Sequence, residues 1–175
     1  MPSGTGPIAR WARGRAPTVP SFASVGHPDR RHDGGTMGIE ENRGLVEDFW
    51  ATLYRRDWDA IAGFFTAESH YTDVPAPEEG AFGPAEIVAR LRLGIEPLES
   101  YFEHRRSLVV TEDMAVTEHG EEWHWHTGEQ VVLPFVSVME LRDGKILRWW
   151  DYWDMQTLMN AAPEWWVVHI MAGYK

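Results

Sequence analysis

Residues 145–153 follow directly after the turn signal Asp143-Gly144 and are rich in large apolar side chains on both faces that a strand would have. This pattern predicts a β-strand in which Asp151 lies on a largely apolar face. The other residues expected on this face are Leu147, Trp149 and Trp153. A carboxylate among large apolar groups is unfavourable unless it is paired, hydrogen-bonded or functional. We therefore expect the strand to form one wall of an apolar pocket, in which Asp151 either does chemistry or makes a structural pair.

Helical periodicity dominates the preceding part of the chain. Residues 39–56 are predicted to form an amphipathic helix, because apolar residues recur there with a spacing of three and four. These residues are Val46, Phe49, Trp50, Leu53 and Tyr54. Asp57 is expected to cap a second, short helix, and Gly83-Pro84 is expected to open a third. Residues 69–75, which end in a proline-rich segment, are predicted to form a short strand.

Long strands with turn signals between them follow the third helix. Their predicted spans are 101–110, 114–126, 131–141 and 145–153, with short helices at 155–159 and 163–171. Helices followed by a run of antiparallel strands indicate the α+β class. Long strands twist and curl, so we expect a curved sheet that wraps round the helices and encloses an apolar cavity.

Residues 1–37 differ from the rest of the chain. They hold five Arg and two Asp among many Pro, Gly and Ser, and they lack apolar periodicity. This composition predicts a disordered N-terminal extension, which leaves residues 38–175 as the folded domain. An organelle transit peptide and translation from Met37 are the alternatives for this segment.

Composition narrows the class of partner. The net charge of −11 argues against binding to nucleic acid or to an anionic membrane surface, and no apolar run is long enough to span a bilayer. With no Cys, the chain has neither a disulfide nor a thiolate site. Ten Trp among 175 residues suit a pocket for a small apolar molecule, although a tightly filled core or a dimer interface would use them equally well. We expect a cytoplasmic protein.

Five polar residues emerge as candidates for catalysis. His119 and Glu121 share a face of the second long strand, and Tyr71 and Asp73 share a face of the short strand. Together with Asp151 they would project into the cavity. Several carboxylates in one apolar space cannot all ionise easily, so one is expected to hold a proton as the acid while another acts as the base. The aromatic residues expected to bind substrate beside them are Trp123, Trp125, Trp149, Trp153 and Phe135.

The opposite face of the second long strand is expected to be solvated. It carries Glu118, Glu122, His124 and His126. His124 and His126 have the spacing of a metal pair, but the sequence places no third ligand beside them. Because phosphate-binding loops and HExxH motifs are also missing, we expect no metal and no cofactor.

Three segments resemble one family. Residues 131–154 are similar to the C-terminal sheet of limonene-epoxide-hydrolase-like proteins, which belong to the NTF2-like, or SnoaL-like, superfamily. Residues 71–75 resemble the Tyr-x-Asn-x-Pro segment of that family, and residues 116–121 resemble its Thr-Glu-Arg-x-Asp strand. The resemblance covers residues 40–160 and implies the NTF2-like cone fold.

The resemblance also implies roles for the five candidates. Asp151 matches the base that activates water, and Glu121 matches the acid that protonates an epoxide oxygen. Tyr71 matches a Tyr that helps to hold the water, while His119 and Asp73 stand where the family has Arg and Asn. Replacing Arg by His removes a permanent charge and a bidentate clamp. The change favours general acid–base chemistry in which His119 takes part.

Three functions remain open on this basis. The first is epoxide-hydrolase-like addition of water, with Asp151 as base and Glu121 as acid. The second is a SnoaL-like or ketosteroid-isomerase-like cyclase, isomerase or dehydratase, with Asp73, His119 or Asp151 as base. The third is a non-catalytic module that binds a small molecule.

A homodimer is also expected. The outer face of the sheet carries apolar residues that are unfavourable in water: Val132, Val136, Val138, Trp150 and Tyr152. Proteins of related fold pair through this face, as the resemblance implies.

Overall fold

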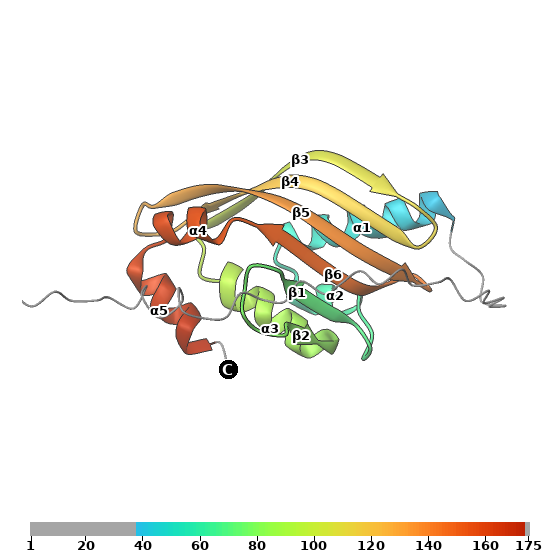
Figure 1. The fold of residues 1–175 in the computed structure, drawn as a ribbon, viewed down its shortest axis with the longest axis horizontal. Coiled ribbons are helices and arrows are strands. Elements are labelled where there is room, and N and C mark those ends of the chain that lie inside the picture. Colours follow the sequence, from blue (N-terminus) through green and yellow to red (C-terminus); the bar gives the residue numbers. More distant parts are fainter. Residues whose placement is uncertain (1–37, 174–175) are drawn as a thin grey trace, which may run out of the picture. The chain divides into compact units, whose positions relative to one another are not determined.

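The computed structural model describes residues 38–173, which form an α+β unit (Figure 1). The prediction for residues 1–37 lies outside the described residues. The helices are α1 (Ile39–Tyr54), α2 (Trp58–Ala62), α3 (Gly83–Ile95), α4 (Met155–Ala161) and α5 (Glu164–Gly173). The strands are β1 (His70–Asp73), β2 (Ala81–Phe82), β3 (Ser100–Val110), β4 (Met114–His124), β5 (Gln130–Arg142) and β6 (Lys145–Trp153). The expected fold class, with its order of helices and long strands, is confirmed.

Helices α2 and α3 begin where local chemistry predicts. The Asp57 side chain accepts a hydrogen bond from the Ala60 backbone N–H, 3.2 Å away, and so caps α2. Pro84 occupies the first turn of α3, where its missing N–H has no helical partner to lose. The apolar stripe of α1 is buried, with Phe49 and Trp50 at 0% exposure. Hydrophobic burial rather than helix propensity therefore holds α1 against the sheet.

The six strands form one curved, mixed sheet in the order β2-β1-β6-β5-β4-β3. Strands β3 to β6 are an antiparallel meander, and β5 turns into β6 through Asp143-Gly144, both with positive φ. Strand β1 pairs with β6 in parallel, which places Asp73 opposite Asp151. The short strand β2, which the sequence pattern did not predict, pairs with β1. The topology thus brings a segment near residue 72 beside the last strand of the sheet.

A β-bulge corrects one detail of the predicted strand faces. Glu140 of β5 pairs with Arg148, whereas the next residue, Leu141, pairs with Ile146. The extra residue on β6 is Leu147, so the alternation shifts by one position there. Ile146 is fully buried as a result, and the expectation that Leu147 shares the inner face with Asp151 is wrong. Beyond the bulge, Trp149 and Asp151 are buried as predicted.

The main core lies between the helices and the inner face of the sheet, where large aromatic rings pack edge to face. The ring centroids of Phe49 and Trp149 are 5.1 Å apart, and those of Trp50 and Trp149 are 5.7 Å apart. Three of the apolar residues predicted on the outer face, Val132, Val136 and Tyr152, are exposed by 57%, 39% and 45%. Among residues 38–173, no helix is both long and apolar enough to cross a membrane.

Candidate active site

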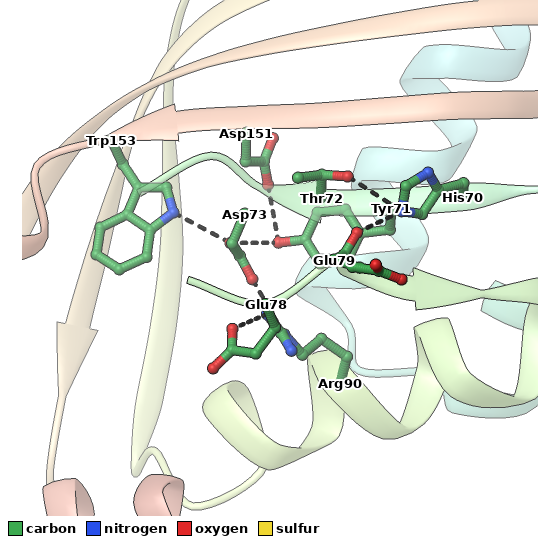
Figure 2. Close-up of polar contacts among 9 residues, drawn as sticks. All are labelled: His70, Tyr71, Thr72, Asp73, Glu78, Glu79, Arg90, Asp151 and Trp153. Carbon is green, nitrogen blue, oxygen red and sulfur yellow. Dashed lines mark hydrogen bonds and ion pairs between the residues drawn. The ribbon is translucent and has the colours of Figure 1, made fainter. Parts of the chain in front are cut away.

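Asp73 and Asp151 lie side by side on β1 and β6, and the Tyr71 hydroxyl lies between them (Figure 2). The Tyr71 oxygen is 2.7 Å from Asp73 Oδ1 and 3.2 Å from Asp151 Oδ2. A phenol has one proton, so it fully satisfies one of the two carboxyl groups at a time. Burial and the two acidic neighbours raise the pKa of Tyr71 well above its ordinary value, which keeps the phenol protonated.

Arg90 of α3 approaches this acidic pair from the side of Asp73 (Figure 2). Its Nε is 3.2 Å from Asp73 Oδ2, and its Nη2 is 3.1 Å from Glu78 Oε2. The side chains of Asp73 and Arg90 are 12% and 11% exposed, so water screens this ion pair weakly. Trp153 Nε1 donates a further hydrogen bond to Asp73 Oδ1 over 3.1 Å. A permanent cation and an indole N–H therefore both contact the Asp73 carboxyl group.

Asp151 is buried and has no cation of its own among the partners described. Ser137 Oγ and Trp149 Nε1 donate to its Oδ1 over 2.5 Å and 2.6 Å. Burial, reinforced by the negative charge of Asp73, raises the pKa of Asp151 well above its ordinary value, although the bonds from Ser137 and Trp149 act in the opposite direction. Asp151 thus holds a proton to a higher pH than an exposed aspartate does.

His119 lies deep in the core and uses both ring nitrogens. Its Nε2 is 3.0 Å from Ser137 Oγ, and its Nδ1 is 3.2 Å from the hydroxyl oxygen of Tyr54. Burial, with a smaller contribution from the positive charge of Arg105, lowers the pKa of His119 to about 4. The imidazole is therefore neutral near pH 7, with one nitrogen as donor and the other as acceptor.

Glu121 is the second buried acid. Its Oε1 accepts from the hydroxyls of Tyr101 and Tyr54 over 2.6 Å and 3.2 Å, and its Oε2 accepts from Trp123 Nε1 over 3.0 Å. Burial raises the pKa of Glu121 to about 7, against the opposing effect of these three donors. The carboxyl group is thus poised to give or take a proton near neutral pH.

The structure joins all five predicted residues in one continuous chain of hydrogen bonds and an ion pair. The chain runs from Glu121 through Tyr54, His119, Ser137, Asp151, Tyr71 and Asp73 to Arg90. His119 is central, as the family's Arg would be, but it reaches the two carboxyl groups through Tyr54 and Ser137 rather than directly.

Sequence reasoning missed four members of this site: Tyr54, Arg90, Tyr101 and Ser137. Two of them carried a usable signal. Ser137 is the one hydroxyl on an apolar strand face between Phe135 and Met139, and Arg90 lies three positions after the buried Ile87, on the same side of α3. Polar residues at such positions need partners, and these partners turn out to be the predicted acids.

The tryptophans predicted to bind substrate hold the carboxyl groups. Trp123, Trp149 and Trp153 each donate their indole N–H to a different acid, namely Glu121, Asp151 and Asp73. These bonds fix the carboxyl groups in place.

Trp125 and Phe135 are the other two predicted substrate-binding residues, and both are buried. The N–H of Trp125 has no hydrogen-bond partner within residues 38–173. For all five aromatic residues, substrate contact stays a prediction.

The opposite face of β4 is solvated, as predicted. Glu122 accepts from His104 and His124, both partly exposed, and Glu118 lies within 3.4 Å of Arg106. His126 packs against the ring of Trp165. Across residues 38–173, no group of three or more His, Asp or Glu is arranged to hold a metal ion.

An open hollow of about 500 Å³ lies elsewhere, between α3 and α5. It is lined by Val88, Arg92, Leu93, Glu96 and His169, among others. None of the lining residues belongs to the chain that joins Glu121 to Arg90, so the hollow is separate from the acidic site.

Comparisons with known proteins agree with this fold. The described unit is similar to an LEH-like epoxide hydrolase from M. tuberculosis, with a TM-score of 0.60 and 18% identity over 77% of this chain and 92% of that one. It is similar to a protein from Shewanella putrefaciens described as a SnoaL-like polyketide cyclase, with a TM-score of 0.62 and 16% identity over 70% and 95% of the two chains. It also resembles the epoxide hydrolase/cyclase-like enzyme SalBIII, with a TM-score of 0.59 and 17% identity over 67% and 94%.

At these identities the structural matches show the fold alone. A search of curated proteins gave no match. The sequence itself matches the model of the SnoaL-like domain over residues 46–149, which is more than half of the chain. Fold and sequence therefore agree, and the chain belongs to the SnoaL-like domain family.

Proposed function

We propose that this protein opens the epoxide ring of a small apolar substrate with water, by acid–base catalysis. The observation that carries the proposal is the pair of buried carboxyl groups, Glu121 and Asp151, joined through hydrogen-bonded side chains. Opening an epoxide needs a base that activates water and an acid that protonates the leaving oxygen. The printed descriptions of two structural relatives, which name epoxide hydrolases, support this choice of reaction.

Asp151 serves as the base in this scheme. Its carboxylate removes one proton from a water molecule while the water oxygen attacks an epoxide carbon. A raised pKa makes Asp151 a stronger base once it is ionised, and the donors Ser137 and Trp149 keep its carboxyl group oriented. Tyr71, between Asp151 and Asp73, helps to position the water.

Glu121 serves as the acid. As the carbon–oxygen bond breaks, the bonding pair goes to the epoxide oxygen, which takes the proton from the Glu121 carboxyl group. Because its pKa is about 7, Glu121 keeps this proton at a pH where an exposed glutamate has lost it. The products are a diol, a protonated Asp151 and an ionised Glu121, so protons and charge balance.

The test is turnover of a panel of small apolar epoxides in water enriched in ¹⁸O. The expected product is a diol that carries one solvent oxygen. Glu121→Gln and Asp151→Asn should each lower kcat by about 10²-fold or more, because each removes a proton-transfer group. Glu118→Gln is the matched control, since Glu118 lies on the solvated face of the same strand. Bound apolar ligands without turnover would favour the non-catalytic binding module instead.

A second candidate reaction is ring closure, in which a hydroxyl group of the substrate replaces water. The observation that favours it is the ion pair of Arg90 and Asp73, which places a further carboxyl group beside a cation at the position where the resemblance implies Asn. Cyclase descriptions among the structural relatives are consistent with it. The ¹⁸O experiment separates the two reactions, because ring closure incorporates no solvent oxygen.

A further inference from the structure

Three side chains lie between Glu121 and Asp151, and each has fewer protons to donate than it has hydrogen-bond partners. The Tyr54 hydroxyl has one proton but lies 3.2 Å from both His119 Nδ1 and Glu121 Oε1. Neutral His119 has one N–H but lies close to both Tyr54 and Ser137. The Ser137 hydroxyl lies close to both His119 Nε2 and Asp151 Oδ1. Each group must therefore donate in one direction and accept from the other.

These limits leave two fully satisfied arrangements. In the Glu121-protonated arrangement, Glu121 donates to Tyr54, Tyr54 donates to Nδ1 of His119, and the Nε2–H of His119 donates to Ser137. Ser137 then donates to an ionised Asp151. In the Asp151-protonated arrangement every bond is reversed: Asp151 donates to Ser137, Ser137 to Nε2, the Nδ1–H to Tyr54, and Tyr54 to an ionised Glu121.

We propose that His119 is a neutral tautomeric switch through which Glu121 and Asp151 share one proton. Conversion between the two arrangements moves four protons, one across each of the four hydrogen bonds. The net charge of the site stays the same, and the heavy atoms keep their hydrogen-bonded positions. The inference rests on the proposed function in one respect, since the Glu121-protonated arrangement is the one that pairs an acid at Glu121 with a base at Asp151.

The surroundings of His119 favour a neutral switch over a cation. The ring lies 4.6 Å from that of Trp50 and 5.5 Å from that of Phe135, centroid to centroid, so a charged imidazole would be poorly solvated. The charged and titratable groups nearest to it are Tyr54 of α1, which it contacts, and Arg105 of β3, which pairs opposite it in the sheet. Glu121 of β4 and Asp151 of β6 are linked to it through Tyr54 and Ser137. An Arg at position 119 would be a permanent donor and could not reverse its hydrogen bonds.

Glu121→Gln should freeze the switch, because Trp123 fixes the orientation of the new amide. The Trp123 indole N–H can only donate, so the amide oxygen must occupy the place of Oε2. The amide NH₂ then faces Tyr54 in the place of Oε1 and donates to it. Tyr54 must in turn donate to Nδ1 of His119, which leaves the proton of His119 on Nε2.

The experiment is ¹⁵N NMR of the histidine side chains in the full chain, from about pH 5.5 to about pH 8.5, the range where a histidine switch is normally examined. Loss of signals in His119→Gln assigns the resonances of His119. Because the exchange leaves the net charge of the site unchanged, it does not itself depend on pH. In the unaltered protein, the two nitrogens should therefore give shifts between the Nε2–H and Nδ1–H patterns, since both tautomers are populated. Glu121→Gln should show the Nε2–H pattern at every pH.

Thr117→Val is the matched control. Thr117 lies directly opposite Ser137 and is equally buried, but its hydroxyl accepts from Trp50 and lies outside the chain that joins the two acids. This variant should keep the mixed tautomer pattern of the unaltered protein at His119. The proposal is overturned if unaltered protein and Glu121→Gln give the same tautomer pattern at His119, or if both nitrogens of His119 become imidazolium-like near pH 7. Because this readout needs no substrate, it is independent of whether an epoxide is turned over.

Discussion

Asp73 and Asp151 are neighbours on parallel strands, and Arg90 pairs with Asp73. Two otherwise similar carboxyl groups therefore have different electrostatic surroundings, because it is Asp73 that pairs with Arg90. The negative charge of Asp73 helps to raise the pKa of Asp151. Relative to the family pattern, a permanent positive charge is missing at His119 and present at the other end of the site, on Arg90.

The first prediction concerns the ion pair of Arg90 and Asp73. Arg90→Gln should destabilise the fold by about 3–5 kcal/mol, because it leaves a buried carboxylate without its cation. Asp73→Asn added to Arg90→Gln should restore part of that loss, since the amide carries no charge. Denaturant unfolding of both single variants and the double variant measures the coupling, which should amount to about 0.5–3 kcal/mol. Additive effects would mean that the pair does not set the charge of Asp73.

The second prediction concerns Glu121 and pH. Its pKa is raised from 4.5 to about 7 on folding, so the folded state binds more protons than the unfolded state between these values. The free energy of unfolding should therefore fall as pH rises from about 4.5 to about 7, and this contribution should level off above pH 7. Glu121→Gln lacks the titrating group and should lose this component.

Denaturant unfolding at several pH values checks this dependence by comparing the two proteins. Glu118→Gln, on the solvated face, should follow the unaltered protein. A Glu121→Gln curve parallel to that of the unaltered protein would contradict a raised pKa at Glu121.

The third prediction concerns assembly. We propose that the chain forms a homodimer through the outer sheet face, where Val132, Val136 and Tyr152 are exposed. Light scattering should give the mass of two chains at micromolar concentration. Val132→Lys should shift the mass toward one chain, because it places a charge in the interface, whereas Val168→Lys on α5, at a similarly exposed Val, should not. A monomer mass for the unaltered protein would exclude this interface.

Periodicity predicted most of the fold. It also predicted the strand faces on which Asp151, His119 and Glu121 lie. Alternation along residues 145–153 placed Asp151 inside, and the spacing of His119 and Glu121 placed both on one buried face. The bulge at Leu147 was not predictable, because it depends on how β6 pairs with β5 rather than on β6 alone.

The connecting residues were harder to predict for a related reason. Tyr54 fits the apolar stripe of its helix, and only the packing of α1 against the sheet reveals that its hydroxyl reaches both His119 and Glu121. Arg90 likewise meets Asp73 across a helix–strand contact that no local pattern encodes. Both contacts join segments that are distant in sequence.

The most direct test of the acid–base account is a single variant, Asp151→Asn, measured for both turnover and stability. Burial raises the pKa of Asp151, so the ionised carboxylate is disfavoured in the folded state and this loss of stability accumulates as pH rises. The account predicts that Asp151→Asn abolishes turnover of the epoxide while the free energy of unfolding at neutral pH stays the same or rises. If Asp151 is purely structural, the variant should lose about 1–3 kcal/mol through weakened hydrogen bonds. A destabilised Asp151→Asn that keeps its activity per folded molecule would contradict the assignment of Asp151 as the base.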